Sequence, residues 1–554
     1  MSLRPVYAQI LPVSIVQRIL GFLNYRANAA TTTQLLHVCS VWRSAILELL
    51  CAEYFLRVVG SSVQDEFTRW PTKLPQPGGA CLGLVRTLRM DIDYNSIFNG
   101  KAVHAIYRLW NTRIVFPNVD EVQVCIRHNS NDRNLLMHDY DSHAHVFAKY
   151  IKQMVPKMTR VCVRYVSFTE VKDMVIGYSF DALITTLFHQ AEYSALHLSF
   201  NDFVHSYQPQ ITHALSQIAC CWNESYDQMV PLIHASSDTL LDLRITCYGL
   251  SRDKLHLLFV SPNNHYVIYH QLERLVFEKA ACREDLYRPT LPQIKPLPKL
   301  QYLKLGILYP FGDDLLFRGN EDTLERLEVT PDLLMLQVLE RHSVFQGNHH
   351  NLKHISVDPY EYPGDRDSAR EGQMAAAIAQ FVHRASPSPQ TVEVQEYRAG
   401  QKLVCSIAHS MHMSTLQVLH IRHSPLTLTD IIALLQSLPL LSELSCICGG
   451  LGEEAIGVPL VRLAESMHQM HYPLSHTFTT WDVVHDYRMP LNHNKAVSDV
   501  VSCAWMLSIM CPSFVRASVG RLHRRRFNSL VNQAISMNSS AKYATHFNNL
   551  LIRQ

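Results

Sequence analysis

The residue pattern closest to known cofactor chemistry is a glycine-rich turn at Gly450–Ala455. Its sequence, GLGEEA, follows a predicted strand and opens a predicted helix, as in the G-x-G-x-x-G/A fingerprint of dinucleotide-binding folds. Glu453 and Glu454 would, however, place negative charge beside a pyrophosphate, and no later strand supplies an acidic residue for a ribose. We therefore interpret the motif as a strand-to-helix turn of a repeat and predict no cofactor-binding residues.

Histidine clusters are the second candidate for chemistry. The chain has 30 histidines, and they gather in two places: His138, Asp139, Asp141, His143 and His145, and His349, His350 and His354. Three or four such side chains could bind zinc if they converged. With so many histidines, chance clusters in polar loops are expected, so we predict no metal site.

Motifs of common enzyme classes are missing from the sequence. It contains no P-loop, no G-x-S-x-G elbow and no H-E-x-x-H motif. We predict a non-enzymatic protein with no catalytic residues. A cysteine–histidine pair that only the fold brings together stays open as an alternative.

The composition is that of a globular protein with neutral overall charge. The chain has 554 residues, 47% hydrophobic and 18% charged, and a formal net charge of +2. Its length predicts several domains or an elongated repeat architecture, and its charge gives no reason to expect nucleic acid or a membrane as the main partner. The 14 cysteines are scattered, which is typical of reduced thiols. With no signal-peptide pattern at the N-terminus, we expect a cytoplasmic or nuclear protein.

A triplet of apolar residues recurs along the chain, and the strands that it predicts would position the polar side chains between the apolar ones. It consists of one anchor, a second anchor three residues later and a third two residues after that. The clear copies are Leu240/Leu243/Ile245, Leu272/Leu275/Phe277, Leu300/Leu303/Leu305, Leu324/Leu327/Val329, Leu352/Ile355/Val357, Leu416/Leu419/Ile421 and Leu441/Leu444/Cys446. The weaker copies are Val85/Leu88/Met90, Val119/Val122/Val124, Met158/Val161/Val163, Tyr193/Leu196/Leu198 and Pro389/Val392/Val394.

The spacing of the triplet predicts a short strand in each repeat. The last two anchors alternate, so they share one face of the strand, while the residue between them points to the other face. Successive first anchors lie 24 to 47 residues apart, which leaves room for a returning helix. We therefore predict an α/β fold, a strand–helix solenoid with one continuous core, with a non-solenoid α/β sheet as the alternative. Residues near the middle of these strands would line the concave face and are candidates for substrate contacts: Arg244, Lys304, Glu328, Glu393, His420 and Arg422.

An apolar stretch near the N-terminus, from Ile10 to about Val58, predicts three short helices. Leu11-Pro12 opens the first, Thr31 to Thr33 can cap the second, and Ser40 can cap a third. Fewer than about 60 residues cannot bury this much apolar surface among themselves without a partner or staples. We interpret the stretch as a docking module that another protein covers.

The same stretch resembles an F-box. The resemblance lies in Leu11-Pro12, Ile15, Ile19-Leu20, Leu23, Leu36, Val38-Cys39 and Trp42-Arg43. In that family the three-helix motif binds a Skp-type adaptor, which links it to a cullin–RING ubiquitin ligase. The resemblance implies these docking residues: Leu11, Pro12, Ile15, Val16, Ile19, Leu20, Leu35 and Leu36.

The repeats in turn resemble the irregular leucine-rich repeats that often follow an F-box. The asparagine that closes each strand in regular repeats occurs only once, as Asn201, so the array is expected to be irregular. We predict an F-box-like module at 8–58, a Pro- and Gly-rich linker at 59–84, the solenoid at 85–482 and a helical cap at 483–554. The cap includes an arginine cluster at 521–526, which we interpret as a solvated helix face.

The function that follows from this resemblance is that of an adaptor without enzymatic activity. It would be the substrate-recognition subunit of an SCF-type ubiquitin ligase, with a Skp-type adaptor, a cullin and a protein substrate as partners. The alternative is a free-standing interaction scaffold with no link to a ligase. A third alternative, a hydrolase or nucleotide-binding enzyme, would need a convergent polar pocket that the sequence does not reveal.

Overall fold

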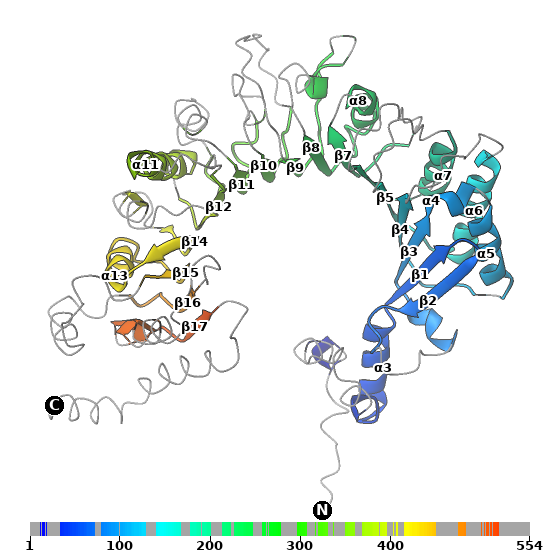
Figure 1. The fold of residues 1–554 in the computed structure, drawn as a ribbon, viewed down its shortest axis with the longest axis horizontal. Helices are drawn as coiled ribbons and strands as arrows, with labels where there is room; N and C mark the ends of the chain where they lie inside the picture. Colours follow the sequence, from blue (N-terminus) through cyan, green and yellow to red (C-terminus); the bar gives the residue numbers. More distant parts are fainter. Residues whose placement is uncertain are drawn as a thin grey trace, which may run out of the picture. The chain divides into compact units, whose positions relative to one another are not determined.

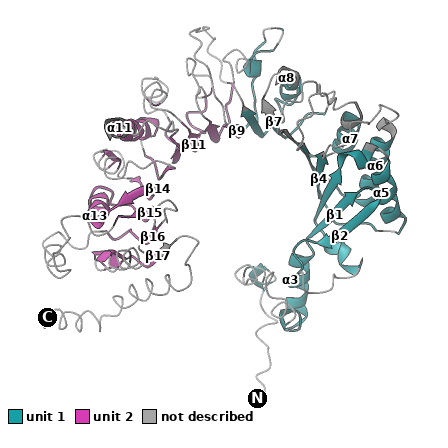
Figure 2. Ribbon diagram, in the orientation of Figure 1, with its two compact units in different colours: residues 1–248, 253–272 teal, residues 249–252, 273–554 magenta. Residues whose placement is uncertain are grey.

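A computed structural model gives the fold of the chain (Figure 1). The structure describes residues 12, 14–16, 18, 34–71, 79–98, 100–112, 114–128, 140–167, 178–189, 191–200, 213–222, 226–247, 257–261, 263, 265–278, 296–306, 316, 319–330, 336, 349–359, 368–386, 388–395, 403, 406–407, 415–449, 475–483, 500, 503–504, 506–508, 510–511 and 513–519. The chain divides into two units (Figure 2). Unit 1 holds residues 1–248 and 253–272, and unit 2 holds residues 249–252 and 273–554.

Unit 1 is built on parallel strands with one antiparallel hairpin. Its strands are β1 (Glu53–Val59), β2 (Ser62–Phe67), β3 (Thr87–Asp93), β4 (Glu121–His128), β5 (Arg160–Ser167), β6 (Tyr193–Phe200), β7 (Gln217–Trp222) and β8 (Asp242–Cys247). β1 pairs with β2 antiparallel and with β3 parallel, and from β3 onward each strand pairs in parallel with the next. The helices that follow β3, β4 and β5 lie on one side of these strands (Figure 1).

The helices of unit 1 are short. They are α3 (Ser40–Leu50), η3 (Gly79–Leu84), α4 (Tyr94–Phe98), α5 (Lys101–Asn111), α6 (Tyr140–Met154), α7 (Tyr178–Phe188) and α8 (Tyr226–Ala235). From β3 to β6 the chain follows the predicted order of strand, helix and strand. A crossover of this kind is what joins two parallel neighbours.

Unit 2 continues the same plan with shorter strands. They are β9 (Arg274–Glu278), β10 (Tyr302–Leu305), β11 (Arg326–Val329), β12 (His354–Val357), β13 (Thr391–Val394), β14 (Val418–Leu426), β15 (Glu443–Cys448), β16 (Thr480–Val483) and β17 (Arg516–Val519). Each pairs in parallel with the next. The helices α11 (Ser368–Ala385) and α13 (Leu428–Ser437) lie on one side of the strands (Figure 1). The fold is thus mixed α/β with long runs of parallel strands, as a solenoid-like architecture requires.

The predicted triplets form the core. All their anchors are buried except Met158 and Tyr193, which are partly buried. The structure adds further copies that the leucine pattern did not reveal. They are Cys51/Tyr54/Leu56, Leu215/Ile218/Cys220, Phe478/Trp481/Val483 and Phe514/Ala517. Three of these copies have cysteine or an aromatic residue instead of leucine as the first anchor, whereas Leu215/Ile218/Cys220 fits the predicted pattern and was overlooked.

Three strands lie outside the residues that we predicted to form the solenoid. Residues at the end of the predicted N-terminal module form β1, and residues of the predicted linker form β2. Gly60, which lies in the predicted linker, turns this hairpin with a φ of 59°, which glycine adopts without a steric penalty. In the predicted helical cap, Arg516–Val519 forms β17, which adds one more strand to the stack.

Threonine hydroxyl groups form hydrogen bonds between successive repeats, a series that we call the threonine ladder. The hydroxyl of Thr323, just before the first anchor Leu324, donates to the carbonyl oxygen of Leu300, the first anchor of the preceding repeat, at 2.9 Å. The same bond joins each of these threonines to the preceding first anchor: Thr239 to Leu215, Thr415 to Pro389 and Thr477 to Leu441. Each hydroxyl satisfies a carbonyl group that the strand pairing leaves open.

The N-terminal helical residues pack around a small core of their own. It consists of Val16, Ala45, Ile46 and Leu50, and partly buried Leu35, Leu36, Trp42, Leu49 and Trp70 pack against it. Trp70 comes from the predicted linker, so a residue outside the helices covers part of this core. In the part of the chain that the structure describes, we find no helix that is both long and apolar enough to cross a membrane.

Candidate functional site

The polar side chains of unit 2 lie on the strand face opposite the anchors. The strand register arranges them in two rows that run across the strands. The first row is Arg274, Tyr302, Arg326, His354, Thr391, Val418, Glu443 and Thr480. The second row is Val276, Lys304, Glu328, Ser356, Glu393, His420, Ser445 and Asp482. Because neighbouring strands are about 4.8 Å apart, residues in one row are close enough to interact.

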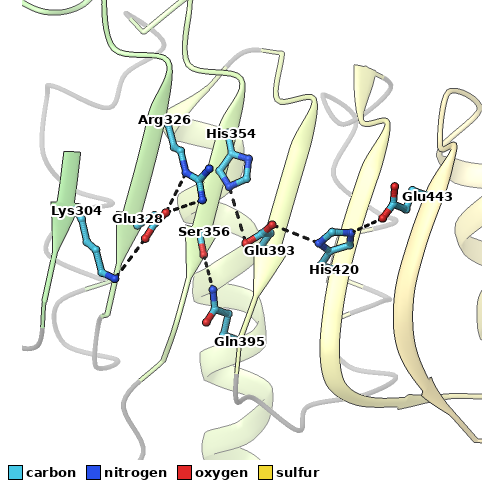
Figure 3. A network of polar contacts seen from close by, with 9 residues as sticks. All are labelled: Lys304, Arg326, Glu328, His354, Ser356, Glu393, Gln395, His420 and Glu443. Carbon is cyan, nitrogen blue, oxygen red and sulfur yellow. Dashed lines mark hydrogen bonds and ion pairs between the residues drawn. The ribbon is translucent and has the colours of Figure 1, made fainter. Parts of the chain in front are cut away.

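Glu328 pairs with two cations near one end of this face (Figure 3). The Nε and Nη2 atoms of Arg326 donate to its Oε1 at 2.9 and 2.7 Å, and the Nζ of Lys304 lies 3.5 Å from its Oε2. Arg326 and Lys304 each keep more than a third of the side chain exposed, so the ion pairs stand at the surface. Such exposed pairs contribute little to stability, and their charge remains accessible to a partner.

A histidine–carboxylate cluster follows on the next strands. His420 Nδ1 lies 3.3 Å from Glu393 Oε1, and its Nε2 lies 3.0 Å from Glu443 Oε1 (Figure 3). Burial alone would lower the pKa of His420, but the hydrogen bonds to both carboxylates raise it above its ordinary value. The His420 hydrogen bond in turn lowers the pKa of Glu393 to about 2. His420 therefore bridges Glu393 on β13 and Glu443 on β15.

His354 lies next to this cluster, and its pKa is shifted in the opposite direction to that of His420. Its Nε2 lies 3.9 Å from Glu393 Oε2, beyond hydrogen-bond range. Burial, and then the nearby Arg326, lower the pKa of His354. Two histidines that face the same carboxylate thus have pKa values shifted in opposite directions, and only His420 has a hydrogen bond to it. Ser356, on the same strand as His354, accepts a hydrogen bond from Gln395 Nε2 at 3.3 Å.

Tyr302 lies between two arginines in the first row. The guanidinium carbon of Arg274 is 4.3 Å from the centre of the ring, and that of Arg326 is 5.5 Å away. Burial, together with the Glu328 carboxylate, raises the pKa of Tyr302 to about 12. The ring is therefore a neutral, half-buried platform for two cations.

Four of the six predicted substrate-facing residues belong to this network: Lys304, Glu328, Glu393 and His420. Arg422 lies on the same strand as His420 and is exposed. Arg244 lies apart from them on β8 of unit 1, where its Nη2 is 2.8 Å from Asp242 Oδ2. Their role in substrate binding stays a prediction.

The sequence reasoning missed the first row. Arg274, Tyr302, Arg326, His354 and Glu443 precede the second anchors, at positions that were not assigned to the strands. Tyr302 and Arg326 lie two residues before the candidates Lys304 and Glu328 and so share a face with them, and counting back by two would have found this pair. Arg274, His354 and Glu443 lie two residues before Val276, Ser356 and Ser445, which were not candidates.

The predicted docking residues fall into three groups. Pro12 and Ile15 are exposed, and Ile15 keeps 43% of its surface accessible. Val16 is fully buried in the module's own core and so presents no surface to a partner, while Leu35 and Leu36 are partly buried against that core. Leu11, Ile19 and Leu20 lie outside the described residues.

The remaining candidates for chemistry lie only partly within the described residues. Within the described ranges, no three histidine, cysteine or acidic side chains are grouped so that they could bind a metal ion. The glycine-rich turn at Gly450–Ala455 and the residues His138 to Asp139 lie outside the described residues.

No protein-family model matches the chain, and no curated protein shows significant similarity to it.

Proposed function

We propose that this protein is a non-enzymatic adaptor with two binding parts. The N-terminal helical module binds a Skp-type adaptor of an SCF-type cullin–RING ubiquitin ligase, and the polar strand face of the repeats binds a protein substrate. The ubiquitin-transfer chemistry then belongs to the ligase. Such a protein would work in the cytoplasm or the nucleus.

The observation that carries the proposal is the exposed apolar surface of the module. Ile15 and Val38 keep 43% and 37% of their surface accessible, although the module is rich in apolar residues and has a core of its own. Exposed apolar residues beside a small core are what a docking surface provides before its partner binds. Pro12 is exposed beside them.

The attachment of the module also suits an adaptor. α3 ends at Leu50, and β1 begins at Glu53, so only two residues join the module to the first strand. The backbone N–H groups of Arg86 and Thr87 both donate to the carbonyl oxygen of Ala52 in this connection, at 2.8 and 3.0 Å. A short, hydrogen-bonded connection limits how freely α3 can move relative to the first strand. An adaptor that presents a substrate to a ligase needs such a fixed attachment.

The docking part can be tested with one charge substitution and a matched control. Ile15→Asp places a carboxylate in the exposed apolar surface, and Leu440→Asp does the same at a residue of equal exposure in unit 2, 44%. We expect purified wild-type protein and Leu440→Asp to bind a purified Skp-type adaptor, and Ile15→Asp to lose at least about tenfold in affinity, equivalent to 1.4 kcal/mol. Unchanged binding by Ile15→Asp would count against the ligase link.

A second candidate function is a scaffold whose N-terminal helices only cover the end of the first strand. The packing of Trp70 against the module's core favours it, because it shows the same chain covering part of the apolar surface. A pull-down from cells separates the two functions. The adaptor and a cullin are recovered with the protein in the first case, and neither is recovered in the second.

A further inference from the structure

Two arginines flank one tyrosine ring at the β9 end of the unit 2 face. Arg274, Tyr302 and Arg326 are in register on three adjacent strands, so the ring lies between the two guanidinium groups. A guanidinium group that stacks on a ring still has N–H groups at its edge that can bind a carboxylate with two parallel hydrogen bonds. The arrangement holds these donors in place before any ligand arrives.

One of these arginines has no acidic partner among the described residues. Arg326 and Lys304 both pair with Glu328, whereas Arg274 meets no carboxylate in the part of the chain that the structure describes. Its Nε is buried and donates no hydrogen bond there. Glu278, on the same strand and face, is four residues away, roughly 13 Å along an extended strand. Arg274 therefore carries a positive charge that no carboxylate of the described residues neutralises, so a ligand that supplies a carboxylate gains affinity there.

We propose that the Tyr302 patch, which consists of Arg274, Tyr302, Lys304 and Arg326, binds an acidic peptide segment of a partner protein. A carboxylate of the segment accepts hydrogen bonds from Arg274, and the adjacent residues of the segment pack on the Tyr302 ring. Lys304 and Arg326 add attraction for a second carboxylate. The inference rests on the proposed function in one respect only: it gives the chemical class of the substrate for the repeat face.

The charges on the neighbouring strands favour a peptide over a nucleic acid. Beyond the patch the same face carries Glu393 on β13 and Glu443 on β15, with His420 between them. A phosphate backbone that crossed these strands would meet their carboxylates. A peptide can place its acidic residues over the patch alone, so it avoids this repulsion.

The test is a titration of the purified full-length protein with fluorescein-labelled peptides, followed by fluorescence anisotropy. One peptide carries adjacent glutamates among glycines and alanines, and its matched control carries glutamines instead. We expect the glutamate peptide to bind at least about tenfold more tightly, as expected for hydrogen bonds to a charged group, and to weaken as salt is added. Equal binding of the two peptides would overturn the proposal.

A pair of variants tests whether the peptide binds at the Tyr302 patch. Arg274→Gln should weaken binding of the glutamate peptide by about tenfold, whereas Arg516→Gln, the same change in the register-equivalent position of β17, should leave it within about twofold. Lys304→Gln, at an exposed side chain, is a second variant should Arg274→Gln fold poorly, and it should weaken binding as well. Equal effects of Arg274→Gln and Arg516→Gln would overturn the assignment, as would tighter binding of a labelled single-stranded oligonucleotide than of the glutamate peptide.

This experiment contains no Skp-type adaptor. A failure of peptide binding therefore leaves the docking test at Ile15 to be decided separately, and a failure at Ile15 leaves the Tyr302 patch intact.

Discussion

His420 on β14 forms a hydrogen bond with Glu393 on β13, with Nδ1 and Oε1 3.3 Å apart. The two residues are neighbours in register, although they lie 27 positions apart in the sequence. The pKa values of both groups move toward the charged pair: that of His420 is raised and that of Glu393 is lowered to about 2. Charge at this point of the face therefore depends on pH.

The pH dependence of stability follows from these shifts. The folded pKa of His420 lies above the ordinary value of 6.5, so its contribution is complete below 6.5 and is lost as pH rises through the folded pKa. The pKa of Glu393 falls from 4.5 to about 2, so its contribution is complete above 4.5 and is lost as pH falls toward 2. The pair is strongest between pH 4.5 and 6.5.

We therefore expect His420→Gln to be more destabilising in mild acid than in mild base. The loss in free energy of unfolding should be larger by about 1 kcal/mol at about pH 5.5 than at about pH 8.5, as measured by urea denaturation. His476→Gln, at an exposed histidine of the same unit, is the control and should show the same small effect at both values. An equal loss for His420→Gln at both values would contradict the ion-pair assignment.

Removal of a buried anchor should cost far more than removal of an exposed leucine. Leu327 on β11 is fully buried, so Leu327→Ala leaves a cavity in the continuous core. We expect a loss of about 2–5 kcal/mol in the free energy of unfolding. Leu440→Ala, at a residue with 44% of its surface accessible, should change it by less than about 0.5 kcal/mol. Similar losses for the two variants would show that Leu327 is not a core anchor.

The threonine ladder gives a prediction that is specific to hydrogen bonding. Thr323→Val keeps the shape of the side chain but removes the hydroxyl that donates to Leu300. The unpaired carbonyl should lower the free energy of unfolding by about 1 kcal/mol. Thr429→Val, at an exposed threonine of α13, controls for the exchange of residue type and should have a smaller effect. If the two variants are equally stable, the ladder does not contribute.

Gly449 lies against the backbone of the neighbouring strand. A Cβ atom there would be 2.9 Å from the carbonyl carbon of Leu426 and 3.0 Å from its oxygen, while the Gly449 N–H donates to that oxygen at 2.7 Å. Gly449→Ala should therefore force β14 and β15 apart and cost about 1–3 kcal/mol in thermal or urea unfolding. Gly83→Ala, where a Cβ would meet nothing within 4 Å, should be tolerated.

Much of the strand order could be predicted because the repeats use leucine. Triplets such as Leu300/Leu303/Leu305 place three apolar residues at fixed spacing. Because these residues must be buried, they determine which side of the strand faces the core. The copy at Cys51/Tyr54/Leu56 was missed because its anchors differ in type, and the hairpin after it was missed because Gly60 is typical of linkers as well as of turns.

The sequence by itself determined which side chains are buried and which share a face, because alternation along a strand decides both. It could not determine which polar residues meet, since Arg274 and Tyr302, or Glu393 and His420, come from different strands of the stack. The tertiary structure decided those contacts through the register of parallel strands, which brings residues separated by a whole repeat within hydrogen-bond distance.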